Sequence, residues 1–194
     1  MKNDRAAEGI RFAGLVARDP APAVRRWKVL TGRMAVGCPP FFPVPEIVHC
    51  VGMLPVMEDP GGPCASLMDA RVAGPEPVPE GRLEALDWIE ELAERAEALS
   101  GERCTEGRLW KSLRAYVERD GLLRRLERLR NDAPGAVELR DLVIVGRYLA
   151  AEMHAVLLEG ILGFGSGPEE REERGDPFLL LADRVVSLER RIDR

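Results

Sequence analysis

The sequence is short of lysine, and it has no long apolar run. Three of its 28 basic residues are lysines, and the net charge of −5 offers no basic surface to nucleic acid or an anionic membrane. No stretch approaches the roughly 18 consecutive apolar residues of a transmembrane helix. The opening segment carries scattered charges where a signal peptide has its apolar centre. We therefore predict a cytoplasmic protein with no nucleic-acid partner and no membrane partner.

Cysteine is also scarce, with four residues at positions 38, 50, 64 and 104. They form no C-x-x-C pair, so their spacing alone indicates no metal site. A reducing compartment disfavours a disulfide scaffold. The common nucleotide, hydrolase and metalloprotease motifs are missing as well. What remains is a chain of 194 residues, 45% hydrophobic and 31% charged, which is the balance of one globular domain with an adequate core.

Chemistry-bearing residues gather in the stretch GCPPFFPVPEIVHCVGMLPV, which covers residues 37–56. Apolar runs at 33–38 and 53–57 predict two short buried strands. Between them, a proline-rich loop leads to Pro45, a favourable first helical residue, and the helix stops at Gly52. A right-handed crossover would make the two strands parallel. This stretch therefore predicts a compact strand–loop–helix–strand unit.

Helical periodicity dominates the rest of the sequence. Residues 58–81, rich in proline and glycine, predict a loop with at most one short element. The predicted helices lie within 8–30, near 82–99, 105–130 and 136–162, and after Asp176 as N-cap. We predict an α/β fold that is predominantly helical, in which a small parallel sheet packs with three to four long helices. Residues 1–75 would form the strand unit with an N-terminal helix and 82–194 a helical region, together one compact domain.

The end of the first predicted strand is the candidate site. Cys38 lies where strand gives way to loop, the position at which open α/β sheets hold ligands. We expect the loop to line a cleft there, with Phe41 or Phe42 contacting a ligand or partner and the amides of Glu46 and Ile47 at its floor. The alternative is that both rings cap the core beneath the helices.

The two histidines have plainer interpretations. His49 and Cys50 are neighbours on one helix and point about 100° apart, so they cannot easily share a metal. We interpret Cys50 as a small buried hydrophobe and His49 as a residue on the helix flank. His154, alone on the third long helix, is interpreted as a surface or packing residue rather than a base.

The stretch 37–56 resembles the N-terminal signature of the 2-hydroxyacyl-CoA dehydratase and benzoyl-CoA reductase subunit family. Cys50 stands where that family usually has alanine. MDARV, residues 68–72, resembles the ADARIQ that follows in the family, and residues 99–162 are similar to its helical segment. The resemblance covers about two-thirds of the chain in the right order. The residues that match the signature are Glu46, Gly52, Leu54, Pro55 and Val56.

The resemblance implies a partial Rossmann-like unit, a relation to acyl-CoA chemistry and assembly from homologous subunits. In the family, a cysteine shortly after the ADA element ligates a [4Fe-4S] cluster. Here DARV is followed by AGPEPVPEG, which has no cysteine, and the family's second domain has no counterpart in the sequence. The family's cluster site therefore carries over to no residue of this chain.

Three hypotheses follow from these matches and departures. The first is a shortened, non-catalytic accessory subunit without a cofactor, which keeps the family scaffold to pair with a larger homologous subunit or with a second copy. The second is an iron–sulfur subunit of acyl-CoA dehydration or reduction, with a [4Fe-4S] cluster at a relocated site that includes Cys38 and Cys64. The third is a protein that keeps an acyl-CoA pocket without redox chemistry.

Overall fold

A small parallel sheet forms the centre of the chain. The computed structural model describes residues 2–76, 79–132, 139–163 and 176–192. Its sheet has three strands, β1 (Ala35–Cys38), β2 (Leu54–Met57) and β3 (Ala70–Arg71), in the order β2-β1-β3. Both pairings are parallel. The two predicted strands and their parallel arrangement are therefore confirmed, and the fold is a predominantly helical α/β fold, as predicted.

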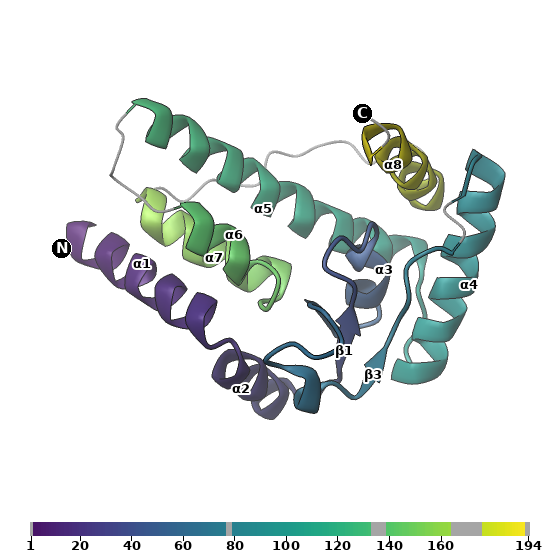
Figure 1. Cartoon of the computed structure of the whole chain (residues 1–194), viewed down its shortest axis with the longest axis horizontal. Helices are drawn as coiled ribbons and strands as arrows, with labels where there is room; N and C mark the ends of the chain where they lie inside the picture. The colour runs from purple at the N-terminus through teal and green to yellow at the C-terminus, as the bar shows by residue number, and fades with distance from the viewer. Residues whose placement is uncertain (1, 77–78, 133–138, 164–175, 193–194) are drawn as a thin grey trace.

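Helices surround this sheet on both faces (Figure 1). One helix lies between β1 and β2 in the chain. A single 3-10 turn, η1 (Ala65–Leu67), lies between β2 and β3. The helices of the described residues are α1 (Lys2–Arg18), α2 (Ala21–Thr31), α3 (Pro45–Cys50), α4 (Arg82–Ser100), α5 (Glu106–Asp132), α6 (Leu139–Val145), α7 (Ala151–Leu162) and α8 (Pro177–Ile192).

The sheet separates two apolar cores because side chains alternate along each strand. On β1, Val36 and Cys38 face a core made with α3, α4 and α8, which we call the α4-side core. Ala35 faces a second core made with α1, α2, α6 and α7, the α1-side core. The long helix α5 serves both, with Leu109 in the α4-side core and Leu126 in the α1-side core. Figure 1 shows this division, with α5 running past both groups of helices.

The predicted third long helix, near 136–162, is interrupted in the structure. Residues 136–138 lie outside the described residues, and the helical segments that follow are α6 and α7. The break contains Gly146, a poor helix former, and ends at Ala150, whose ψ of 146° is extended. Within it, the carbonyl of Arg147 accepts a hydrogen bond of 3.0 Å from the amide of Met57. The prediction of one continuous helix was therefore wrong, because the chain breaks where a carbonyl accepts a hydrogen bond from the edge strand.

Two other predictions need correction. The segment 58–81 holds two short elements, η1 and β3, where at most one was expected. Its aspartate Asp69 accepts a hydrogen bond of 2.9 Å from the amide of Ala35, which fixes the segment beside β1. The helical periodicity of the sequence also continues past the packed parts of the helices, since Leu30 and Leu83 are 70% and 77% exposed.

Helix ends agree better with the sequence. Gly101 follows α4 with a φ of 73°, a left-handed conformation that glycine adopts without steric cost. The side chain of Asp176 accepts a hydrogen bond of 2.9 Å from the amide of Phe178, so the predicted N-cap of α8 is confirmed. Leu181 and Val185 of this helix are buried in the α4-side core. In the described part of the chain, no helix is both long and apolar enough to cross a bilayer.

Candidate functional site

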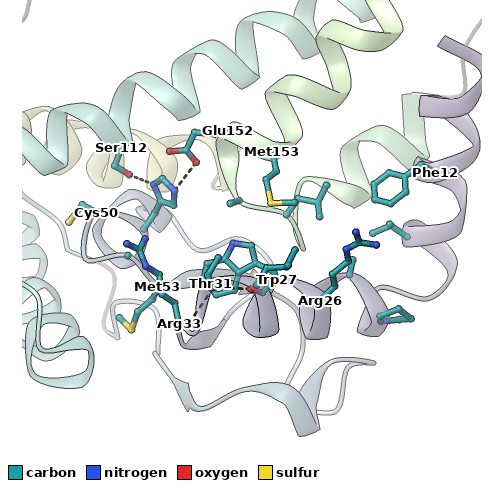
Figure 2. Close-up of a pocket in the computed structure, with 18 of the residues that line it drawn as sticks. Phe12, Arg26, Trp27, Thr31, Arg33, Cys50, Met53, Ser112, Glu152 and Met153 are labelled. Atoms are coloured by element: carbon teal, nitrogen blue, oxygen red, sulfur yellow. Dashed lines mark hydrogen bonds and ion pairs between the residues drawn. The ribbon is translucent and has the colours of Figure 1, made fainter. Parts of the chain in front are cut away.

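A groove of about 1060 Å³ lies between α1, α2, α3, α5 and the start of α7 (Figure 2). Its volume is close to the upper end of the roughly 300–1,000 Å³ of small-molecule sites. One wall is apolar, and Phe12, Trp27 and Met153 lie along it in Figure 2. Ser112 and Glu152 lie at the other end, beside Arg33. The groove therefore has an apolar length and a polar end.

His49 organises the polar end. Its Nδ1 lies 2.9 Å from the hydroxyl oxygen of Ser112, and its Nε2 lies 3.0 Å from Oε2 of Glu152. The ring also packs edge-on against Tyr116, with 5.6 Å between ring centroids. These contacts hold one imidazole between residues of α5 and α7, so α3 is fixed to both helices through it.

The charges at this end favour an ionised carboxylate. The hydrogen bond from His49 lowers the pKa of Glu152 below its usual range, and the charge of Lys111 acts in the same direction. Arg108 pairs with Glu102 at 2.5 Å. The Arg33 guanidinium packs where a side chain at Gly52 would lie, 3.1 Å from the position of a Cβ atom there. Arg33, Arg108 and Lys111 thus line the groove together with the Glu152 carboxylate.

A serine, a histidine and a carboxylate in contact one after the other suggest the catalytic triad of a hydrolase. Ser112, however, is poorly placed to act as the nucleophile. Ser112 is 1% exposed, and its hydroxyl donates a hydrogen bond of 3.0 Å to the carbonyl oxygen of Glu46. It lies inside α5, so the backbone amides around it are taken up by the helix and cannot stabilise an oxyanion. The three residues therefore order and charge one end of the groove rather than activate a nucleophile.

The residues predicted around the first strand end do not line this groove. The thiol of Cys38 is buried, and its burial raises its pKa to about 12. The Glu46 side chain is also buried and pairs with Arg184 of α8. The amide of Ile47 donates to the carbonyl of Val44, 3.1 Å away, so it is not available to a ligand. These groups hold the fold in place around β1.

The two phenylalanines of the loop separate. Phe42 is 5% exposed and packs edge-on against Trp88 of α4, with ring centroids 6.1 Å apart. Phe41 is 87% exposed. One ring therefore belongs to the α4-side core, and the other faces solvent. Contact of Phe41 with a ligand or partner stays a prediction.

A relocated cluster site does not fit the described thiols. Cys38 belongs to the α4-side core and Cys64 to the α1-side core, on opposite faces of the sheet. Over the described ranges, no three or more histidine, cysteine or acidic side chains come together as metal ligands. The two cysteines that do meet are Cys50 and Cys104, whose Sγ atoms are 2.8 Å apart. Two thiols alone cannot hold a [4Fe-4S] cluster.

The interpretations of Cys50 and His154 agree with the structure, whereas that of His49 was incomplete. Cys50 is buried, as interpreted, and His154 is a packing residue with a fully buried ring. The flank position of His49 is confirmed, but its contacts were missed, as were Ser112 and Glu152. The sequence offers one signal for this end of the groove, which is Lys111, a lysine in an arginine-rich chain. That lysine does not identify the contacts of the histidine.

Comparison with the models of known protein families gives no match, and comparison with curated proteins gives none either. The resemblance to the dehydratase and reductase subunits therefore stays a prediction. What the fold and the groove define is a predominantly helical α/β protein with a groove that has an apolar length and a polar end.

Proposed function

We propose that the chain is a non-catalytic accessory subunit, a shortened relative of 2-hydroxyacyl-CoA dehydratase and benzoyl-CoA reductase subunits, which pairs with a homologous subunit. The partner is either a larger subunit of that family or a second copy. The observation that carries the proposal is the apolar rim of the groove, where Leu15 and Leu30 are 66% and 70% exposed and lie near Phe12 and Met153. Apolar surface gathered in this way is stabilised when a partner removes it from water.

The chemistry of the described residues supports a binding role over a catalytic one. The hydroxyl of Ser112 is buried, and the thiols of Cys38 and Cys64 each have a pKa raised to about 12, chiefly by burial. A thiol with so high a pKa is not ionised near neutral pH and is a poor nucleophile. These groups therefore supply no activated nucleophile in the core.

Sedimentation velocity at micromolar concentration tests the pairing. The chain alone, and then mixed with a larger subunit of the family from the same genome, is compared with the double variant Leu15→Ser and Leu30→Ser. Leu83→Ser is the matched control, since Leu83 is equally exposed but lies on α4 outside the groove. We expect wild type and the control to form a heavier species that the double variant loses. A wild-type chain that stays monomeric in both samples rejects the proposal.

A second candidate function, binding of an acyl-CoA without redox chemistry, is favoured by the cations at one end of the groove. Lys111 and Arg33 lie at the polar end, while Trp27 and Leu15 line the apolar length. Phosphates would pair with the cations, and the acyl chain would bury apolar surface.

Calorimetric titration with a medium-chain acyl-CoA, and with free coenzyme A, tests this candidate. Lys111→Gln should weaken binding several-fold, while Arg128→Gln, exposed on the same helix but outside the groove, should not. Free coenzyme A should bind more weakly because it buries no chain. Absence of measurable heat with the acyl-CoA, or equal effects of both substitutions, counts against it.

The iron–sulfur hypothesis has a direct measurement. A sample purified without oxygen is assayed for iron and acid-labile sulfide and examined for visible absorption. We expect neither metal nor colour, because no three metal-ligating side chains converge among the described residues. Stoichiometric iron and sulfide would restore that hypothesis and overturn the accessory role without a cofactor.

A further inference from the structure

Two of the four cysteines are in direct contact although 54 residues separate them. Cys50 is the last residue of α3, and Cys104 lies in the turn between α4 and α5. Their Sγ atoms are 2.8 Å apart. The other two cysteines make no such contact, since the Sγ of Cys38 meets backbone groups and Cys64 is buried in the other core.

We propose that Cys50 and Cys104 are a redox modification site, which a small-molecule disulfide converts reversibly into an intramolecular disulfide bond. The sulfur atoms need to approach by less than 1 Å to reach the bond length of about 2.05 Å. Both partners are held in place by their surroundings. The amide of Cys104 donates to a carboxylate oxygen of Glu97 at 2.6 Å, and α3 is held through the hydrogen bond from Ser112 to Glu46.

The environment assigns different roles to the two thiols. Cys104 is partly exposed, whereas Cys50 is buried. The hydrogen bond from the Cys50 thiol lowers the pKa of Cys104, and the Arg108 charge adds to this effect. Cys104 is therefore the thiol that a reagent reaches first and that ionises more readily, and Cys50 is the thiol that completes the reaction.

The reaction proceeds by two exchanges. The Cys104 thiolate attacks one sulfur of the small disulfide, that S–S bond breaks, and the first small thiolate leaves and takes up a proton. Cys50 then loses its proton and attacks the Sγ of Cys104, and the mixed disulfide bond breaks to release the second small thiolate. The protein gives up two electrons and two protons, and the small disulfide is reduced to two thiols.

The bond would join α3 to the turn between α4 and α5. Closing a loop between residues 54 apart restricts the unfolded chain, so the oxidised protein should unfold at a higher temperature than the reduced one. Cys50 also lines the groove, so the site lies beside His49 at its polar end. The inference stands apart from the accessory function, because it depends only on the contact between the two thiols.

Oxidised glutathione is the probe. The folded protein is incubated with it, remaining thiols are alkylated after denaturation, and the modified cysteines are identified by mass spectrometry. We expect the wild type to lose the mass of two hydrogen atoms, to keep only Cys38 and Cys64 open to alkylation, and to recover all four thiols with dithiothreitol. The treated wild type should also melt at a higher temperature than treated Cys104→Ser.

Three serine variants make the test sharp. Cys50→Ser should retain a glutathione adduct on Cys104, because the second exchange is blocked, and Cys104→Ser should form no internal bond. Cys64→Ser, the matched control, should oxidise like the wild type. Alkylation of all four wild-type thiols after treatment overturns the proposal. So does a wild type that keeps the adduct on Cys104, or a bond that includes Cys38 or Cys64.

Discussion

The backbone amide of Met57 donates a hydrogen bond of 3.0 Å to the carbonyl oxygen of Arg147. Met57 ends the edge strand β2, whose outer side has no neighbouring strand in the described sheet. Arg147 lies in the break between α6 and α7, and its own amide turns back to Ile144 at 3.0 Å. The break thus covers part of a strand edge, which would otherwise present unpaired backbone groups.

Gly146, within this break, should not tolerate a side chain. A Cβ atom there would lie 2.8 Å from two atoms of the His154 ring, which is fully buried and has little room to move. We expect Gly146→Ala to lower the free energy of unfolding by roughly 1–3 kcal/mol. Gly121→Ala is the control, because nothing lies within 4 Å of a Cβ atom at this helical position. Urea unfolding should show the control unchanged or stabilised by about 0.5–1 kcal/mol, and equal effects would contradict the packing argument.

His154 should make the protein sensitive to mild acid. Burial, together with the charge of Arg119, lowers its pKa from 6.5 to about 4. The unfolded chain therefore binds a proton more readily than the folded chain, and stability present above pH 6.5 is lost as the pH falls toward 4. We expect urea unfolding to show a loss of about 2 kcal/mol between roughly pH 7.5 and pH 5.

The chain has only two histidines, so the source of this pH dependence can be isolated. His154→Gln should flatten the profile over the same interval, whatever its effect at neutral pH. His49→Gln should leave most of the slope in place. A steep profile that survives in the His154 variant would assign the acid sensitivity to other groups.

The two phenylalanines of the loop should differ sharply in their contribution to stability. Phe42→Ala removes a buried ring that packs against Trp88, and we expect a loss of about 3–5 kcal/mol. Phe41→Ala removes an exposed ring and should change stability by less than about 0.5 kcal/mol. Thermal melts of both variants measure the difference. Binding of a partner by wild type but not by Phe41→Ala would give the exposed ring a role in recognition.

Arg184 should contribute more to the free energy of unfolding than an ordinary surface arginine. It pairs with the Glu46 carboxylate, which is 1% exposed, so its loss leaves a buried charge without its cation. Because the arginine itself is 40% exposed, we expect Arg184→Gln to cost roughly 2 kcal/mol, below the range for a fully buried pair. Arg82→Gln removes a cation from a half-exposed pair with Asp183 and should cost less than about 1 kcal/mol.

A double-mutant cycle separates the pair from the general effect of removing an arginine. Glu46→Gln combined with Arg184→Gln should recover part of the stability that Arg184→Gln alone loses, since the buried charge is then gone. If the two substitutions simply add, the buried ion pair is not the reason for the cost.

The sequence predicts two of the three strands because their signals are local. Pro39 follows the last residue of β1, Pro45 begins α3, and Gly101 follows α4, and each of these residues acts through its own backbone conformation. The break between α6 and α7 has a weaker local signal, and its cause is a hydrogen bond to Met57, some 90 residues away in the chain. The local periodicity of a sequence carries no information about a hydrogen bond between residues so far apart.

The site was harder to predict for the same reason. His49 meets Ser112 and Glu152 only because α3, α5 and α7 pack together, and no spacing rule joins positions so far apart. Cys50 and Cys104 belong to no recognised cysteine motif, so the sequence gives no reason to pair them. The loop of Phe41 and Phe42 is conspicuous in the sequence because residues 39–43 are three prolines and two of the chain's five phenylalanines, although its buried ring belongs to the core.

The ion pair between Glu46 and Arg184 also affects how the chain folds during its synthesis. The two residues are 138 positions apart, so at roughly 5–20 residues per second a ribosome makes the arginine about 7–28 s after the glutamate. During that interval, α3 and the strands can form, but the carboxylate cannot be buried beside its cation. Burial of Glu46 at that stage would leave its carboxylate without a cation. We therefore expect this face of the sheet to stay open to water until α8 has been made. The unit of α3 and the strands is therefore synthesised early, but its packing is completed only when α8 is available.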